Sequence, residues 1–368
     1  MKQILFVIYL LCSQWAASQN ISQPKETIRD KLYSEAIRQA ERFIDSLQAK
    51  QGIPGISVSV GTKDKILWAE GFGLADVENQ VPVTVVSKFR IGSVSKSLTT
   101  LAVGKLVEEG KLDLDAPITK YGVNFPKKKY PITARQLATH TAGMRHYQNG
   151  DGLNCLRTFK TVEESFVIFS SDSLLFQPGT AYNYSTYGYS LLSAVVEKAS
   201  NTPFLNYMQT AVFAPLGMSN TGADYSDQLV AQRVRFYEIQ KGRVVNAEQC
   251  DNSYKWAGGG LLSTPSDLVV MSASLLNHSL LKKETVELLF TPQLLSNGVN
   301  TNYGLGWRLG MDKKGRKIIH HGGSINGGRT FVMIYPDNNL VIAITANALD
   351  GTNINVPEAE TLANYFVK

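Results

Sequence analysis

The chain has 368 residues, and 43% of them are hydrophobic, which is enough for a large core in one or two structural units. The formal net charge is +6, and the positive residues are scattered apart from the lysine run 127–129. Scattered charge of this kind argues against nucleic-acid binding and indicates an ordinary solvated surface.

The first 18 residues have the pattern of a secretory signal peptide. Lys2 precedes the apolar run 4–11, and Ala16-Ala17-Ser18 offers small residues for cleavage. We therefore expect a secreted or periplasmic protein. A lipoprotein signal at Cys12 is the weaker alternative, because Leu11 is large where a small residue is expected, and an uncleaved anchor is another. No later stretch is long and apolar enough to span a membrane.

Both ends of the remaining chain have strand patterns next to a helix. Apolar residues at helical spacing predict a helix over 28–47, which ends by Gly52. Strands follow at 56–60 and 65–70, joined by the turn 61–64. Near the C-terminus the pattern predicts three strands and a closing helix, at 317–320, 330–335, 340–345 and 357–367.

Helical segments and long loops dominate the middle of the chain. We therefore predict an α/β sheet unit made of 19–117 and 256–368, with a helical unit at 118–255 between them. The clearest helices in and just after the middle are predicted at 189–199, at 202–213 and from Pro265, with Thr264 as its cap.

The stretch 89–100 holds the strongest candidate for chemistry. Its apolar spacing predicts a buried helix that begins at Ser93 and stops near Gly110. Ser93 then lies at the helix N-terminus, where free N–H groups and the helix dipole favour negative charge. Lys96 follows one turn later on the same face. We interpret Ser93 as a nucleophile and Lys96 as the cation that activates it.

The Ser-x-x-Lys pattern is weak by itself. It recurs at 22–25 and 279–282, and Ser93 has the alternative role of a plain helix cap with Lys96 on the surface. A catalytic role therefore needs companion residues elsewhere in the chain.

Two later stretches supply such companions. The tyrosine-rich loop 178–189 contains Tyr184, which would act as a phenolate base beside a cation such as Lys96. Its alternative role is ordinary packing with a satisfied hydroxyl. The stretch 320–328 contains His321, a candidate donor to a substrate carboxylate or to the tyrosine oxygen. The alternative there is a glycine-rich turn with a surface histidine.

Cysteine and histidine usage points to no metal site. No Cys-x-x-Cys pair occurs, and the histidines lack the spacing of a zinc site. Cys155 and Cys250 are the cysteines beyond the signal segment. A disulfide between them and two separate thiols stay open as alternatives, because sequence does not give their distance.

Three motifs in order resemble those of the penicillin-recognising serine hydrolases. They are Ser93-x-x-Lys96, Tyr184-Ser185-Thr186 and His321-Gly322-Gly323, and the match is to the branch of class C β-lactamases, D-alanyl-D-alanine carboxypeptidases and esterases. The resemblance runs from about Ile53 to the C-terminus. Further segments that carry it are 136–143 and 215–218, while 145–147 and 251–260 are closer still to a mitochondrial, filament-forming branch of the family.

The resemblance implies an α/β domain with an antiparallel sheet, an all-α insert, and an active site between them. It implies that Ser93 forms an acyl-enzyme, that Lys96 and Tyr184 move the proton, and that Tyr184 activates water for deacylation. The N–H groups of Ser93 and Ser324 would form the oxyanion hole. No metal or organic cofactor is needed. The residues implied to orient the substrate are His321, Gly322, Gly323 and Thr186.

Two departures from the family pattern bear on the substrate. Thr186 replaces the usual Asn, so a single hydroxyl stands where an amide offers a separate donor and acceptor. His321 replaces the usual Lys and is only partly charged at neutral pH. Both changes argue against efficient β-lactam hydrolysis.

We therefore expect a serine peptidase or esterase that acts on a peptide, an ester or a β-lactam-like amide. A β-lactamase or a D-alanyl-D-alanine carboxypeptidase is the alternative within the same chemistry. An alternative of another class is a slow-turnover penicillin-binding or filament-forming scaffold, which would self-associate.

Overall fold

The computed structural model describes residues 26–148, 151, 155–349 and 351–367. The predicted signal peptide, residues 1–18, lies outside the described residues. None of the helices in the described ranges is both long and apolar enough to cross a membrane.

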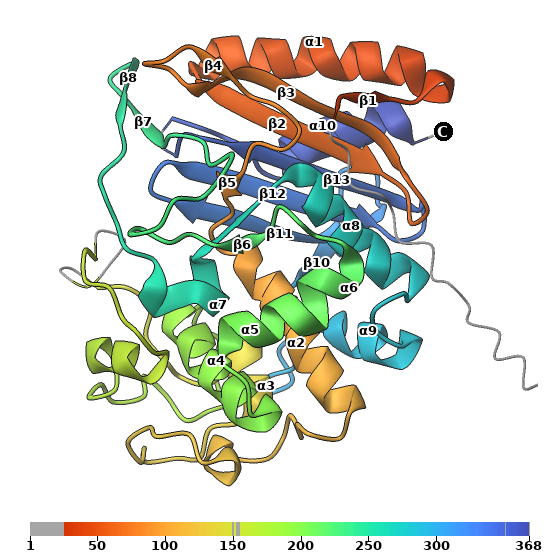
Figure 1. Ribbon diagram of the computed structural model, residues 1–368. Helices are drawn as coiled ribbons and strands as arrows, with labels where there is room; N and C mark the ends of the chain where they lie inside the picture. The colour runs from red at the N-terminus through yellow and green to blue at the C-terminus, as the bar shows by residue number, and fades with distance from the viewer. Residues whose placement is uncertain (1–25, 149–150, 152–154, 350, 368) are drawn as a thin grey trace, which may run out of the picture.

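One antiparallel sheet is built from both ends of the chain, as predicted (Figure 1). Its central strands are buried on both faces, because side chains alternate between two cores. In β13, for example, Val341 and Ala343 join one core while Ile342 and Ile344 join the other. The strand order is β1 (Ile28–Arg29), β3 (Ile66–Asp76), β2 (Gly55–Gly61), β13 (Leu340–Ala346), β12 (Gly328–Tyr335), β11 (Lys317–Ile325) and β10 (Arg308–Met311), with β4 (Val81–Pro82) paired to β3.

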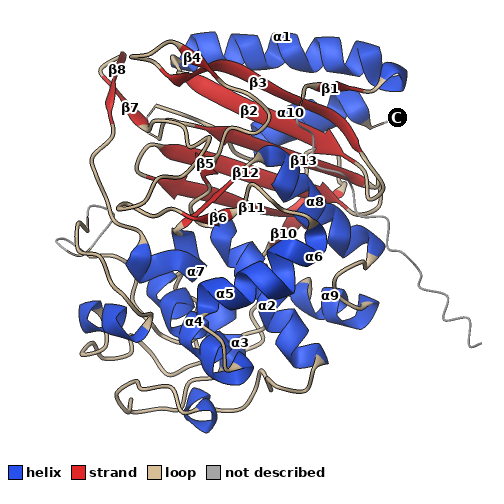
Figure 2. Cartoon of the chain, in the orientation of Figure 1, coloured by secondary structure: helices blue, strands red, loops and turns tan. Residues whose placement is uncertain are grey.

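Helices cover both faces of this sheet, so the molecule has three layers (Figure 2). Helix α1 (Ser34–Gln51) and helix α10 (Val356–Phe366) cover one face. Helix α8 (Pro265–Asn277) lies on the other face, beside the helical half of the molecule. The other helices of that half include α3 (Ala134–Ala138), α4 (Thr186–Ser200), α5 (Phe204–Met208), α6 (Ala214–Leu216), α7 (Trp256–Gly259) and α9 (Lys283–Leu289).

Helix α2 (Val94–Glu108) lies at the junction of the sheet and the helices. It packs against α4, α7 and α9 and also against β11. One cluster of buried residues therefore continues from the helices to the sheet, and it includes Leu98, Leu191 and Val332. The boundaries proposed at 117/118 and 255/256 stay a prediction, since α2 and α7 share a core with α4.

Several predicted elements are confirmed, and others differ in extent, among them β3, which runs on to Asp76 beyond the predicted end at residue 70. Helix α8 is capped by Thr264, as predicted. The first helix begins at Ser34 rather than at residue 28, because Ile28 pairs with Ala69 and Asp30 caps a short 3-10 turn. Strand β11 runs on to Ile325, beyond the predicted end at residue 320.

The glycine at position 323, in this extension of β11, has a steric cause. A Cβ at Gly323 would lie 1.9 Å from the carbonyl oxygen of Ile91, so this strand position admits only glycine. Glycine normally lowers strand propensity, and the pattern His-Gly-Gly was therefore interpretable as a turn. The close contact brings β11 against the chain that enters α2.

A buried ion pair also fixes the segment that leads into α2. Arg90, in the short strand β5 (Phe89–Arg90), donates to Asp224 at 2.6 Å and to the Asn326 carbonyl at 2.9 Å. Asn252 donates to the same carboxylate at 2.8 Å, and Arg233 pairs with it at 3.2 Å. This network ties the residues before Ser93 to the β11–β12 turn and to the middle of the chain. The remaining strands are β6 (Gly222–Ala223) and β9 (Leu261–Ser263), which pair beside β5, and the hairpin β7 (Tyr237–Gln240) and β8 (Arg243–Asn246).

Substitution of Asp224 tests how much this network contributes to the stability of the fold. We expect Asp224→Ala to lower the free energy of unfolding by about 3–5 kcal/mol, because it leaves the buried guanidinium of Arg90 unpaired. The exposed Asp64 offers a control, and Asp64→Ala should change it by less than about 0.5 kcal/mol. Urea unfolding followed by circular dichroism measures both. Equal effects of the two variants would contradict the role given to the network.

Candidate active site

Ser93 lies at the N-terminus of α2, directly after a backbone turn. Gly92 has φ +49°, and a Cβ there would come within 2.8 Å of the Ser324 nitrogen. The turn therefore needs glycine, both for its left-handed backbone and for the approach of β11. Ser93 is the N-cap residue, but its side chain makes no capping hydrogen bond. Its hydroxyl is thus directed to other partners.

Lys96 lies one turn along α2 and is completely buried. Its Nζ donates to Ser93 Oγ at 3.2 Å, to Thr186 Oγ1 at 3.1 Å and to the Gly258 carbonyl at 2.5 Å. The ring of Tyr184 is 4.8 Å from the same nitrogen. In the part of the chain that the structure describes, no carboxylate lies within ion-pair distance of Nζ.

This environment disfavours a charged lysine. Burial lowers the pKa of Lys96 well below its ordinary 10.5, and the positive charges of Lys255 and Arg308 lower it further. A larger fraction of Lys96 than of an ordinary lysine is therefore neutral near physiological pH. A neutral amine hydrogen-bonded to a serine hydroxyl can accept its proton, so this pair has the geometry of a base and a nucleophile.

Tyr184 lies in the loop that precedes α4, and it lines the same cavity as Ser93. Burial raises the pKa of Tyr184 above that of an ordinary phenol, and the nearby Ser93 side chain offsets only part of this rise. The side chain is therefore a neutral phenol in the resting site. This favours Lys96 as the base, with Tyr184 as a donor and relay, over the phenolate suggested by the sequence.

The neighbours of Tyr184 are fixed to the loop after α3. Ser185 N–H donates to His140 Nδ1 at 3.1 Å, and Asn183 Nδ2 donates to the Met144 carbonyl at 2.9 Å. The His140 ring itself lies 4.2 Å from the Tyr184 ring. Burial lowers the pKa of His140 well below 6.5, so it supports the tyrosine as a neutral ring. The sequence motif alone did not indicate this positioning role.

The side chain of Thr186 contacts Lys96 as well as lining the cavity around Ser93. Its Oγ1 accepts from Lys96, and its N–H donates to His146 Nδ1 at 3.3 Å. Gly258 packs on its methyl group, where an added Cβ would lie 2.6 Å away. Thr186 thus helps to hold Lys96, and its predicted part in substrate binding stays a prediction.

Strand β11 brings the third motif beside Ser93. Its pairing with β10 ends at His320, whereas its pairing with β12 continues to Ile325. One edge of Gly322–Ile325 is therefore free of strand partners and borders the site. Ser324 pairs with Arg329 across the hairpin and lies next to Gly92. This position is compatible with the predicted oxyanion hole formed by the N–H groups of Ser93 and Ser324.

His321 is placed differently from the other residues of its motif. It is 1% exposed and does not line the cavity around Ser93. Its Nε2 is 2.9 Å from the Tyr303 hydroxyl, and its Nδ1 is 2.8 Å from the Gly322 carbonyl. Burial and the charge of Lys96 lower its pKa well below 6.5. A direct contact of His321 with substrate stays a prediction, and the geometry favours a neutral supporting residue.

Residues of all three motifs meet at a cavity of about 300 Å³. Six of its lining residues were not singled out as site residues from the sequence, although most of them lie in segments that carried the family resemblance. These six are His146, Tyr147, Lys255, Gly258, Gly259 and Ile325, and the other described lining residues are Ser93, Tyr184, Thr186, Gly322 and Ser324.

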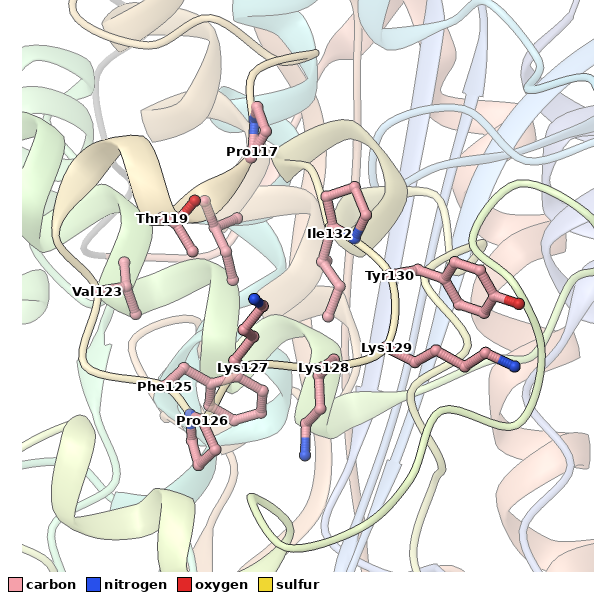
Figure 3. A pocket seen from close by; sticks show the side chains of 12 residues that line it. Pro117, Thr119, Val123, Phe125, Pro126, Lys127, Lys128, Lys129, Tyr130 and Ile132 are labelled. Atoms are coloured by element: carbon pink, nitrogen blue, oxygen red, sulfur yellow. The ribbon is translucent and has the colours of Figure 1, made fainter.

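A second cavity, of about 340 Å³, lies apart from this chemistry (Figure 3). It is lined by Phe125, Pro126, Ile132 and the lysine run 127–129, and none of the three catalytic candidates borders it.

Within the described ranges, no group of three or more His, Cys, Asp or Glu side chains is placed to hold a metal ion. Cys155 and Cys250 are both free thiols.

The chain is similar to several known proteins over most of its length. A family model described as Beta-lactamase matches residues 40–364. The mitochondrial serine beta-lactamase-like protein LACTB of Homo sapiens is 31% identical, over 83% of this chain and 73% of its own length. Penicillin-binding protein 4* of Bacillus subtilis (strain 168) is 27% identical, over 78% of this chain and 66% of its own. The solved octameric penicillin-binding protein homologue from Pyrococcus abyssi has a TM-score of 0.75 and 29% identity, over 84% of this chain and 73% of that one.

Loss of the buried amine should slow acylation of Ser93. We expect Lys96→Met to reduce the second-order rate of labelling by a fluorophosphonate at least about 100-fold, because no base then takes the serine proton. Lys105 lies near the other end of the same helix, and Lys105→Met should be labelled by the fluorophosphonate at the wild-type rate. Intact-mass kinetics measures both variants. Wild-type labelling of Lys96→Met would show that another group activates Ser93.

Proposed function

The chain belongs to the beta-lactamase family of serine hydrolases and penicillin-binding proteins, and we propose that it is a hydrolase that works through an acyl-enzyme at Ser93. The observation that carries this proposal is the direct contact of Ser93 Oγ with a buried amine that has no acidic partner among the described residues. Tyr184 completes the arrangement, since it lines the same cavity as Ser93 and its ring centre lies 4.8 Å from the Lys96 amine.

The acylation step follows from these contacts. Neutral Lys96 takes the proton of Ser93, and Oγ forms a bond to the carbonyl carbon of the substrate. The carbonyl π electrons move to its oxygen, where the N–H groups of Ser93 and Ser324 donate to the resulting anion. The carbon–leaving-group bond then breaks, and the leaving group takes a proton through Tyr184, which is replenished from Lys96.

Deacylation reverses these roles with water as the nucleophile. Water enters beside Tyr184 and gives up a proton as its oxygen bonds to the acyl carbon. Tyr184 is neutral at rest, so it accepts the proton of the water only as it passes its own to the amine of Lys96. Lys96 then returns a proton to Ser93 Oγ as the ester bond breaks.

The free edge of Gly322–Ile325 bears on the substrate class. An extended peptide or amide can donate to and accept from an unpaired strand edge, and such bonds do not depend on side chains. We therefore favour a peptide, an ester or a related amide as substrate. The alternatives are a β-lactam and a D-alanyl-D-alanine peptide, for which the buried His321 lacks the charge of the usual lysine.

Localisation and assembly belong to the same proposal. Residues 1–18 support export to a secreted or periplasmic location.

The similar Pyrococcus abyssi protein is described as octameric, which supports self-association of this chain as well. We expect light scattering with size-exclusion chromatography to show a mass above that of one chain. A single-chain mass at every concentration would remove the scaffold alternative.

Ser93→Ala tests the nucleophile. We expect a fluorophosphonate to add once to the Ser93 peptide of the wild type and to leave Ser93→Ala unlabelled. Hydrolysis of p-nitrophenyl butyrate should fall by about 1,000-fold or more, because the covalent route is lost. Ser97→Ala, one turn along α2, is a matched serine control and should keep the label. Wild-type activity in Ser93→Ala would overturn the proposal.

A further inference from the structure

A second buried lysine lines the cavity around Ser93. Lys255 ends the 3-10 turn Ser253–Lys255, just before α7, and its side chain is 1% exposed. Its Nζ donates to the Tyr254 hydroxyl at 2.8 Å. The ring centres of Tyr254 and Tyr147 lie 4.7 and 5.6 Å from the same nitrogen. The ammonium group is therefore held mainly by aromatic faces.

These partners leave the charge of Lys255 incompletely satisfied. An ammonium group has three donors, and the hydrogen bond to Tyr254 uses one of them. Within the described ranges, no carboxylate lies at ion-pair distance from Nζ. A buried cation without an anion is costly, and such a group at the wall of a cavity is suited to an anion that arrives with a ligand.

The basic residues of the three sequence motifs do not fill this role. Lys255 is the one lysine or arginine among the described residues that line the cavity. Lys96 is engaged with Ser93, Thr186 and Gly258. His321 is buried against Tyr303 and away from the cavity. The cation that would meet a substrate therefore comes from the segment before α7, not from β11.

We propose that Lys255 binds a carboxylate of the substrate while Ser93 attacks its carbonyl carbon. This inference rests on the proposed function, and it makes Lys255 a residue that determines specificity. Both residues border a cavity of about 300 Å³, so a group bound to Lys255 belongs to the same small part of the substrate that Ser93 attacks. The enzyme then prefers acyl donors with a free carboxylate close to the scissile bond.

Matched substrates isolate this preference. One pair, N-acetyl-aspartyl and N-acetyl-asparaginyl p-nitroanilide, varies the acyl side. The other, hippuryl thioglycolate and hippuryl thioglycolamide, varies the leaving group. Within each pair a carboxylate is exchanged for a carboxamide of the same shape. We expect the wild type to show a higher kcat/KM for the carboxylate in at least one pair, by about 10-fold or more.

Variants then assign the preference to one side chain. Lys255→Met should abolish it, while Lys255→Arg, which keeps the charge, should retain most of it. Lys283→Met removes an exposed lysine of α9 and should behave as the wild type. The melting temperature of Lys255→Met should not fall, because an apolar side chain of similar length replaces a buried charge. A lost preference with an unchanged melting temperature separates binding from folding.

The preference should also depend on pH. Burial lowers the pKa of Lys255 to about 8, so the ammonium form prevails below that pH and is lost above it. The ratio of the two kcat/KM values within a pair should fall as the pH rises through about 8. Taking the ratio cancels the titration of Lys96. The ionisable groups that act on Lys255, are acted on by it or contact its amine are Arg90, Asp224, Cys155, Cys250, Lys96, His146, Tyr147 and Tyr254. All are unchanged in Lys255→Arg, which should keep its ratio at higher pH.

The outcomes separate this inference from the proposed function. Equal ratios in the wild type and Lys255→Met for both pairs would overturn the binding role. Failure to hydrolyse either pair, by a protein that a fluorophosphonate labels at Ser93, would also overturn it and leave the nucleophile intact. Absence of any label at Ser93 would overturn the proposed function and this inference together.

Discussion

The burial of the Lys96 ammonium group without a carboxylate is the constraint on which the site depends. A charged amine in this position is disfavoured, and two of the three oxygens around it, from Thr186 and Gly258, come from distant segments of the chain. These segments must therefore fold against α2 before the amine has its full set of partners. The cost in stability is tied to function, because the same burial frees the amine to take a proton from Ser93.

The sheet and its ion network keep this arrangement in register. Arg90 and Asp224 fix the strand before the nucleophile, and Gly323 lets β11 pass against it. On the other side, the loop of His140 fixes the residues that flank Tyr184. Each group that acts on the carbonyl is thus attached to a rigid element, while the cavity between them stays open to a substrate. This division is typical of preorganised active sites.

Sequence predicted the elements better than it predicted the surroundings of the side chains. Periodicity gave the start of α2 and the sheet strands, because burial follows a repeat that can be read locally. It missed the extension of β11 through Gly322 and Gly323, since glycine is needed there for a contact with Ile91 that lies far away in sequence. The burial of His321 and the place of Lys255 at the cavity also arise from tertiary packing, which no local pattern records.

The pH dependence of Ser93 acylation tests the central claim most directly. A neutral fluorophosphonate reports the reactivity of the serine without any titration of its own. The account predicts that the labelling rate rises with pH through one ionisation, with a pKa well below the ordinary 10.5 of lysine. In Lys255→Met this ionisation should move to higher pH, because a positive charge that depresses the pKa of Lys96 is removed. A rate that does not change with pH, or an ionisation at the ordinary value of lysine, would contradict the assignment of Lys96 as the base.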